Sequence, residues 1–213
     1  MIYLLSDEHG GERVGDLKKY IDTATKNDIL IILGDSGVKF SNTQENCEFD
    51  KMLLSSKNQI AIVDGNHENF NYLYSLPKEE WNGGVVNRLT KNIVQLNRGY
   101  VFEIQGKTFF VFGGCKSSQK WKEQGVWYPE EEGSAEEFAR AYYSLKKHNY
   151  KVDYILMHKY ETENTVDTKE YYNLCKFIDD NVEYKHFYSG HWHFYKRVDK
   201  KHTYVYGELV CVE

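Results

Sequence analysis

Carboxylate, imidazole and amide side chains follow short apolar runs at several places in this sequence. The runs at 2–5, 29–33 and 60–63 each give way at once to polar residues and glycine. The side chains of interest there are Asp7, His9, Asp35, Asn66 and His67. An aspartate and a histidine two residues apart can converge on one point in extended or turning backbone. Mixed oxygen and nitrogen donors suit a transition or borderline divalent metal.

Two later apolar runs also end in histidine. His158 follows the run 152–157, and His191 and His193 follow the run 184–188. In extended backbone the last two share a face, so both imidazoles can reach one metal cluster. Each short motif also has an ordinary explanation, such as a helix cap at an aspartate or a glycine turn. Five motifs in order, each at the end of an apolar run, favour a common site.

Strands and helices alternate in the first third of the chain. Apolar residues at helical spacing predict helices over about 13–26 and 43–56, between strands at 2–5, 29–33 and 60–63. This is a βαβ arrangement, whose right-handed crossovers place the ends of parallel strands along one edge of a sheet. Open α/β sheets bind ligands outside that edge.

The rest of the chain is expected to form a second sheet. Pro77 and Asn82-Gly83-Gly84 predict mostly irregular structure over 69–91, and residues 113–133 are expected to be a loop that walls the active site. Strands are predicted from 93 onward, with a hairpin through Gln105-Gly106 and three antiparallel strands at the end. The predicted ranges are strands 93–96, 99–104, 107–112, 152–157, 184–188, 194–198, 202–206 and 208–212, and helices 134–149 and 168–180.

The order of these motifs resembles the calcineurin-like metallophosphoesterases. That family is recognised by Asp-x-His, Gly-Asp, Gly-Asn-His-Glu or Asp, a lone His, and Gly-His-x-His. The resemblance implies an α/β fold, a two-sheet αββα sandwich of mixed β-sheets flanked by helices. It also implies an enzyme that hydrolyses a phosphoester with a metal-bridging hydroxide. One metal would be held by Asp7, His9, Asp35 and His193, and the second by Asp35, Asn66, His158 and His191.

The implied chemistry agrees with the donor types. Two divalent cations about 3.5–4 Å apart can share a hydroxide and clamp phosphoryl oxygens during in-line displacement. We expect manganese first, with iron, zinc, cobalt or nickel also fitting. By resemblance His67 faces the substrate, where it would act as general acid or stabilise phosphoryl charge. Glu68 is expected to support the ligands without binding metal.

The sequence departs from the protein serine/threonine phosphatases of this superfamily. They continue Gly-Asp-x-x with Asp-Arg-Gly, which supplies a partner for the catalytic histidine, whereas this chain has Val38-Lys39-Phe40. Phe112-Gly113-Gly114 and Trp127-Tyr128-Pro129 instead resemble small bacterial and phage metallophosphoesterases, whose usual alanine after the glycine pair is Cys115 here. Substrate contacts are expected from Lys39, Trp127 and Trp192.

Composition narrows the function classes. At 213 residues the chain is expected to be a single domain over 1–213. The net charge of −5, with no basic stripe, makes nucleic acid a less favoured partner than a small phosphoester. No segment is predicted to span a membrane or to act as a signal, so cytoplasmic residence is expected. The four scattered cysteines are interpreted as free thiols. A metal-dependent nuclease and a non-catalytic protein-binding scaffold are the alternatives.

Overall fold

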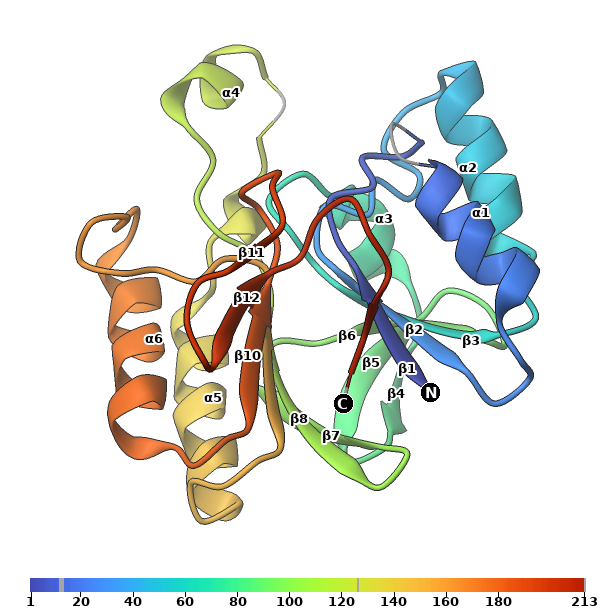
Figure 1. Cartoon of the computed structure of the whole chain (residues 1–213). Helices are drawn as coiled ribbons and strands as arrows, with labels where there is room; N and C mark the ends of the chain where they lie inside the picture. Colours follow the sequence, from blue (N-terminus) through green and yellow to red (C-terminus); the bar gives the residue numbers. More distant parts are fainter. Residues whose placement is uncertain (12–13, 126, 213) are drawn as a thin grey trace.

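Two β-sheets pack face to face in the computed structural model, and helices cover their outer faces (Figure 1). The structure describes residues 1–11, 14–125 and 127–212. Arg13, the predicted start of the first helix, lies outside these residues. The arrangement is an αββα sandwich of mixed sheets, as the resemblance implied.

The first sheet has the strand order β13-β1-β2-β3-β6-β5-β4. Its centre is parallel, because β1, β2, β3 and β6 all run in the same direction. Antiparallel strands close both sides. The bounds are β1 Ile2–Leu5, β2 Ile29–Leu33, β3 Gln59–Val63, β4 Lys78–Trp81, β5 Gly84–Arg88, β6 Ile93–Leu96 and β13 Val210–Cys211.

The second sheet has the order β11-β12-β10-β9-β8-β7. The strands β8, β9, β10 and β12 are parallel to one another, and β7 and β11 are antiparallel edges. The predicted hairpin through Gln105-Gly106 joins β7 to β8. The bounds are β7 Tyr100–Ile104, β8 Lys107–Phe112, β9 Tyr154–Met157, β10 His186–Ser189, β11 Lys196–Arg197 and β12 His202–Tyr204.

The four long helices form the two outer layers. In Figure 1, α1 and α2 lie on one side and α5 and α6 on the other. Local sequence sets their starts, because Thr43, Ser134 and Thr168 cap the first turns of α2, α5 and α6. Ser134 does so with Glu137 in a capping box, which the sequence Ser134-Ala135-Glu136-Glu137 predicts. The helices are α1 Val14–Thr23, α2 Gln44–Leu54, α3 Phe70–Ser75, α4 Gln119–Glu123, α5 Ala135–Lys147 and α6 Lys169–Asn181, with a 3₁₀ turn η1 at Pro129–Glu131.

Three apolar clusters hold the layers together. The central cluster fills the space between the sheets, with Leu33, Val63, Phe109 and Leu156 among its members. The other two join the first sheet to α1 and α2, and the second sheet to α5 and α6. Strands buried on both faces are apolar, which is why β2 and β9 are unbroken apolar runs and β3 is apolar after Gln59.

Several sequence expectations need correction. Residues 69–91 are mostly regular, with α3 and a β4–β5 hairpin turning at Asn82-Gly83, because this pair supplies the two positive φ angles of a tight turn. The strand at 93–96 was expected in the second sheet, but β6 belongs to the first, where it pairs with β3. The last three strands were expected to be antiparallel to one another, but β13 pairs with β1 in the first sheet and β12 runs parallel to β10. The 113–133 loop contains α4 and η1. Helical spacing predicts inward positions for Cys47, Met52 and Leu53 of α2, but Cys47 is exposed and Phe49 is buried instead.

Candidate metal centre

The predicted ligands gather where the carboxyl ends of parallel strands from both sheets meet. Asp7 and His9 follow β1, Asp35 follows β2, and Asn66 and His67 follow β3 in the first sheet. The ligands contributed by the second sheet are His158 after β9 and His191 and His193 after β10. The edge predicted for the first three strands therefore extends across both sheets.

Four of these residues form a first cluster, Asp7, His9, Asp35 and His193, whose ligand atoms all lie within 4.8 Å of one another. The His193 Nε2 atom is 3.1 Å from His9 Nε2 and 3.4 Å from Asp7 Oδ1. Asp35 Oδ2 is 3.8 Å from His9 Nε2. Two nitrogen ligands of one tetrahedral cation are separated by about 3.3 Å, so the cluster has the spacing of a metal site.

The second cluster lies on the other side of Asp35. The Asp35 Oδ2 atom is 3.4 Å from His158 Nε2. The same His158 nitrogen is 3.1 Å from Asn66 Oδ1. His191 Nδ1 faces the same space and lies 3.5 Å from Cys115 Sγ. Asp35 is thus the one carboxylate that both clusters share among the described residues.

The ligand-bearing turns adopt unusual backbone conformations. Five ligands have φ in the left-handed region, at 61° for Asp7, 46° for His9, 50° for Asp35, 72° for His191 and 53° for His193. Non-glycine residues rarely adopt such angles, and Asp, Asn and His adopt them more readily than others. Strain of this kind concentrates at functional sites, where the surrounding structure holds it in place.

Hydrogen bonds orient the ligand atoms. The His158 Nδ1–H group donates to the Leu33 carbonyl at 2.8 Å, which directs Nε2 at the cluster. Asn66 Nδ2 donates to Ser117 Oγ at 3.0 Å, so its carbonyl oxygen points to the metal side. The His67 amide donates to Asp35 Oδ1 at 2.7 Å.

Two protonation states suit cation binding, and a third requires proton release. Burial lowers the pKa of His158, but Asp35 outweighs it and raises that pKa to about 9, so a cation must displace a proton from this imidazole. Burial favours a neutral Asp35, but His158 outweighs it and holds the pKa of Asp35 well below its usual range. Burial lowers the pKa of His191 to about 2, so its imidazole is neutral at pH 7. Burial also lowers the pKa of His67, against the opposing effect of Asp35. The cluster therefore offers a carboxylate and a neutral imidazole to a cation.

Glu68 ties two ligand turns together. Its carboxylate accepts hydrogen bonds from Ser36 N at 2.9 Å, Ser36 Oγ at 2.8 Å and Gly65 N at 3.3 Å. A Cβ atom on Gly65 would overlap the Asp35 carboxylate, so the two turns pack in direct contact. Burial raises the pKa of Glu68 to about 8. Glu68 lies behind the ligands, as expected.

His67 faces two cavities of about 730 Å³ each, which both also include Asn66, Trp121 and His191 in their walls. The edge of Trp121 meets the His67 ring, with centroids 4.8 Å apart. Trp121 belongs to α4, which stands clear of the sheets in Figure 1. Sequence reasoning missed this residue, although the aromatic content of the 113–133 loop indicated where to look.

The three predicted substrate contacts lie in different places. Trp192 lines the second cavity. Lys39 is directed at Asp50, 3.6 Å away, and is not among the lining residues of either cavity. Trp127 stacks under Lys122 and is also outside both linings. Their roles stay predictions.

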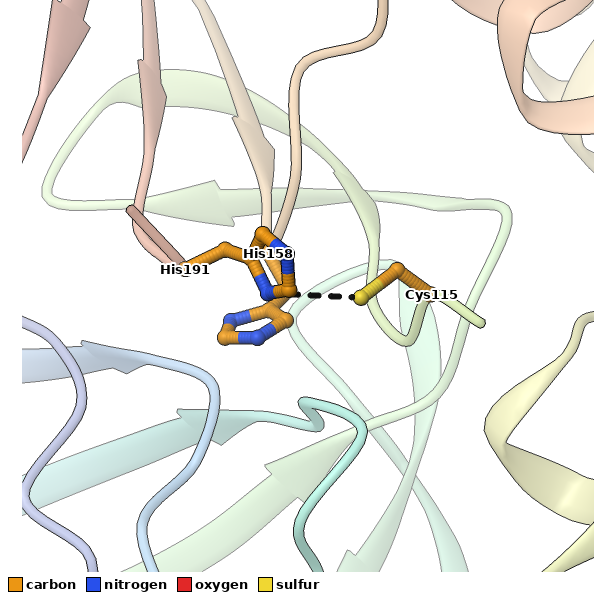
Figure 2. Close-up of side chains that lie close together, drawn as sticks. All are labelled: Cys115, His158 and His191. Atoms are coloured by element: carbon orange, nitrogen blue, oxygen red, sulfur yellow. Dashed lines mark hydrogen bonds between the residues drawn. The ribbon is translucent and has the colours of Figure 1, made fainter. Parts of the chain in front are cut away.

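Cys115 is the other residue that sequence reasoning missed. All four cysteines are free, as interpreted, but Cys115 is buried beside His158 and His191 (Figure 2). The available signal was its place directly after a strand, β8, where the other ligands also occur.

The donor set fits divalent cations, because carboxylate, imidazole and amide oxygen converge at ligand spacing from both sheets. None of the described helices is long and apolar enough to cross a membrane. No curated protein compared with the chain matches it. The calcineurin-like phosphoesterase family matches residues 1–195, a range that includes every predicted ligand. The chain therefore belongs to the calcineurin-like phosphoesterase family and is a metal-dependent phosphoester hydrolase.

Proposed function

We propose that this enzyme is a dinuclear phosphodiesterase acting on a small, exposed diester. The first cation would be held by Asp7, His9, Asp35 and His193. The second would be held by Asp35, Asn66, His158 and His191. The observation that carries this proposal is the position of Asp35 Oδ2, 3.8 Å from His9 Nε2 and 3.4 Å from His158 Nε2. A carboxylate so placed can bridge two cations.

In the proposed hydrolysis, His67 and Asp35 have different roles. When bound, the two cations would polarise the phosphoryl oxygens and acidify a water molecule. His67 is placed to donate a proton to the leaving oxygen or a hydrogen bond to the phosphoryl group, because it lines both cavities beside Asn66. Asp35 fixes the His67 backbone through the 2.7 Å hydrogen bond, which holds that histidine at the cluster.

The two cavities favour a diester over a monoester. A diester carries two organic groups on phosphorus, and His67 lines two cavities of about 730 Å³ each. Trp121 lines both cavities, Phe40 adds an apolar side chain to the first, and Ser118 and Gln119 add polar side chains to the second. Each cavity could therefore receive one substituent of a diester.

The linings of the two cavities suit a nucleic acid less well than a small diester. Polymer binding needs several cations in a row to neutralise successive phosphates. The lysines in the lining are Lys116 and Lys159, and Lys159 is buried in an ion pair with Asp167. Among the residues that the structure describes, the lining of the first cavity includes Glu45 and neither lysine nor arginine. A scaffold role is also less favoured, because all seven ligand positions and His67 are present.

A substrate panel tests the proposal. Purified enzyme loaded with manganese is assayed on bis-para-nitrophenyl phosphate, para-nitrophenyl phosphate and single-stranded DNA. We expect kcat/KM to be highest for the bis-ester. A preference for the monoester would refute the diester assignment, and cleavage of DNA in preference to both would favour the nuclease.

The bridging role of Asp35 is tested separately. Asp35→Asn keeps the size of the side chain and removes the charge that both cations would share, so metal analysis should find both positions depleted. Asp50→Asn serves as the control, because Asp50 binds Lys39 away from the cluster. Full occupancy in Asp35→Asn would rule out a bridging carboxylate.

A further inference from the structure

Cys115 occupies the wall of the second cluster. It follows β8 in the turn after Gly113-Gly114 and is fully buried. Its Sγ atom lies 3.1 Å from Asn66 Oδ1 and 3.5 Å from His191 Nδ1. Figure 2 shows the sulfur directed toward the two imidazoles, and the ligand atoms of Cys115, His158 and His191 lie within 4.8 Å of one another.

The sulfur has the spacing of a ligand. A thiolate at about 2.3 Å and an imidazole at about 2.1 Å from one tetrahedral cation are separated by about 3.6 Å. The observed separation between Cys115 Sγ and His191 Nδ1 is 3.5 Å. The amide oxygen and the two imidazoles of this cluster face the same point as the sulfur.

The backbone fixes the sulfur in this place. The Gly114 amide donates to the Asp64 carbonyl at 2.7 Å, and the Tyr171 hydroxyl donates to the Gly113 carbonyl at 2.8 Å. Gly114 has a φ of 74°, which an L side chain rarely adopts. The turn that presents Cys115 is therefore built on the same strand end, Asp64, as the Asn66 ligand.

The other three thiols lie elsewhere. Cys47 is exposed on α2 and Cys211 is exposed on β13. Cys175 is buried in α6, where its sulfur accepts from the Glu161 amide. Cys115 is the one thiol among the described residues that shares a cluster with histidine.

We propose that Cys115 is a sulfur ligand of the second cation, together with Asn66, His158 and His191. This inference rests on the second metal position of the proposed function. On binding, the sulfur–hydrogen bond is replaced by a sulfur–metal bond and the proton passes to water, with no change of oxidation state. A thiolate favours zinc, cobalt or iron over manganese and magnesium. The second position is therefore selective for a softer metal than the first.

Cobalt spectroscopy tests the sulfur bond without relying on turnover. Wild type, Cys115→Ser, Cys115→Ala and the control Cys47→Ser are loaded with Co²⁺ and their near-ultraviolet spectra recorded. We expect a sulfur-to-cobalt charge-transfer band in wild type and Cys47→Ser, and its loss in both Cys115 variants. X-ray absorption of the zinc-loaded wild type should contain a zinc–sulfur path at about 2.3 Å.

Proton release gives a second readout. Zinc binding to wild type should release one proton more than zinc binding to Cys115→Ser, measured with a pH indicator in weak buffer. Competition between zinc and manganese should shift toward manganese in both Cys115 variants, and Cys47→Ser should match wild type.

The outcomes separate this inference from the proposed function. A wild-type spectrum without the charge-transfer band, in protein that hydrolyses the bis-ester, would overturn the role of Cys115 and leave the diesterase standing. A band that persists in Cys115→Ser would overturn it as well. The wild-type spectrum alone can refute the inference. The test therefore remains decisive even if a Cys115 variant fails to fold.

Discussion

At the residue scale, His67 is held by packing and by its backbone. Val38 stands where the related protein phosphatases have an aspartate, and it is buried in the core beside α1 and α2. Among the described residues no side chain hydrogen-bonds the His67 imidazole. The edge of the Trp121 ring and the amide bond to Asp35 position it instead.

Removing the His67 side chain should strongly reduce turnover and spare the metal sites. We expect His67→Ala to lower kcat by about 10²–10⁴-fold, the usual contribution of general acid catalysis. Metal content should be unchanged, because His67 is not one of the clustered ligands. His148→Ala is the matched control, since His148 ends α5 and bonds Ser144. Unchanged turnover in His67→Ala would remove this residue from the mechanism.

The ligand types could be predicted from sequence, but their contacts could not. Asp7, Asp35 and His158 were visible because each directly follows an apolar run, or nearly so. The common site was predicted, but the left-handed backbone angles of the turns were not, so the contacts between individual ligand atoms could not be predicted. Trp121 and Cys115 reach the cluster only through the path of the 113–133 segment.

At the element scale, a buried ion pair ties the centre to the second sheet. Arg98, in the turn between β6 and β7, donates from Nε to Asp64 Oδ2 at 2.7 Å. Asp64 directly follows β3 and begins the turn that carries Asn66 and His67. Arg98 also donates to the Glu130 carbonyl at 2.8 Å, which fixes η1 against the same turn. Both side chains of the pair are buried.

Breaking this pair should be costly. Arg98→Met would leave the Asp64 carboxylate buried without its partner, and we expect the free energy of unfolding to fall by about 3–5 kcal/mol. The double variant Arg98→Met/Asp64→Leu should lose less than the single one, because no unpaired charge remains. Urea unfolding measures both. A double variant less stable than Arg98→Met would contradict a buried unpaired charge as the cause.

A histidine also joins β12 to α6. His202 lies 3.2 Å from Asp179 and 2.9 Å from Asp199, and it stacks on Tyr160. Tyr184 contacts both the histidine and Asp179. Burial favours a neutral imidazole, but the two carboxylates outweigh it and raise the pKa of His202 above 6.5. The folded state therefore binds the His202 proton more tightly than the unfolded state.

This linkage predicts a pH-dependent stability. The stabilisation from His202 is complete below pH 6.5 and is lost as the pH rises through the raised pKa. The difference in unfolding free energy between wild type and His202→Gln should therefore be largest in mildly acidic buffer and decline as the buffer becomes alkaline. Denaturation in a series of buffers measures it. A difference that grows with pH would show that the folded protein holds His202 neutral.

The strands and long helices were predictable because hydrophobic periodicity is local. The error over 69–91 has a physical cause, since β4 is a polar edge strand whose exposed Lys78, Glu79 and Glu80 produce no apolar pattern. The sheet to which β13 belongs was predicted wrongly for a different reason. Two residues suffice there because β1 supplies a preformed edge, which no local pattern records.

At the scale of the whole molecule, the residues of the candidate metal centre come from both sheets. Asp7, His9, Asp35 and Asn66 come from one sheet and His158, His191 and His193 from the other. A cation bound only by the folded protein stabilises it by mass action, by about 2.7 kcal/mol per site at 100 times the dissociation constant. Such a gain corresponds to ~5–10 °C in a chain of this size.

Chelation should therefore lower the Tm. We expect a strong chelator to reduce it by at least that amount, and added manganese or zinc to restore it. The measurement is a thermal scan with metal, with chelator, and after re-addition. Asp35→Asn should respond weakly to chelator, because its sites are already depleted. A wild-type Tm that is changed neither by the chelator nor by re-added metal would contradict a metal centre that joins the sheets.

The separation of the ligands in the sequence also determines at what point during synthesis the full ligand set is present. Asp7 and His191 are 184 residues apart, yet the His191 amide donates to the Asp7 carboxylate. At about 5–20 residues per second, synthesis separates the two by about 10–40 s. During that interval the nascent chain carries Asp7, His9 and Asp35 without their partners. The cations must therefore be selected after His191 and His193 have been made, from whatever ions the newly completed chain encounters.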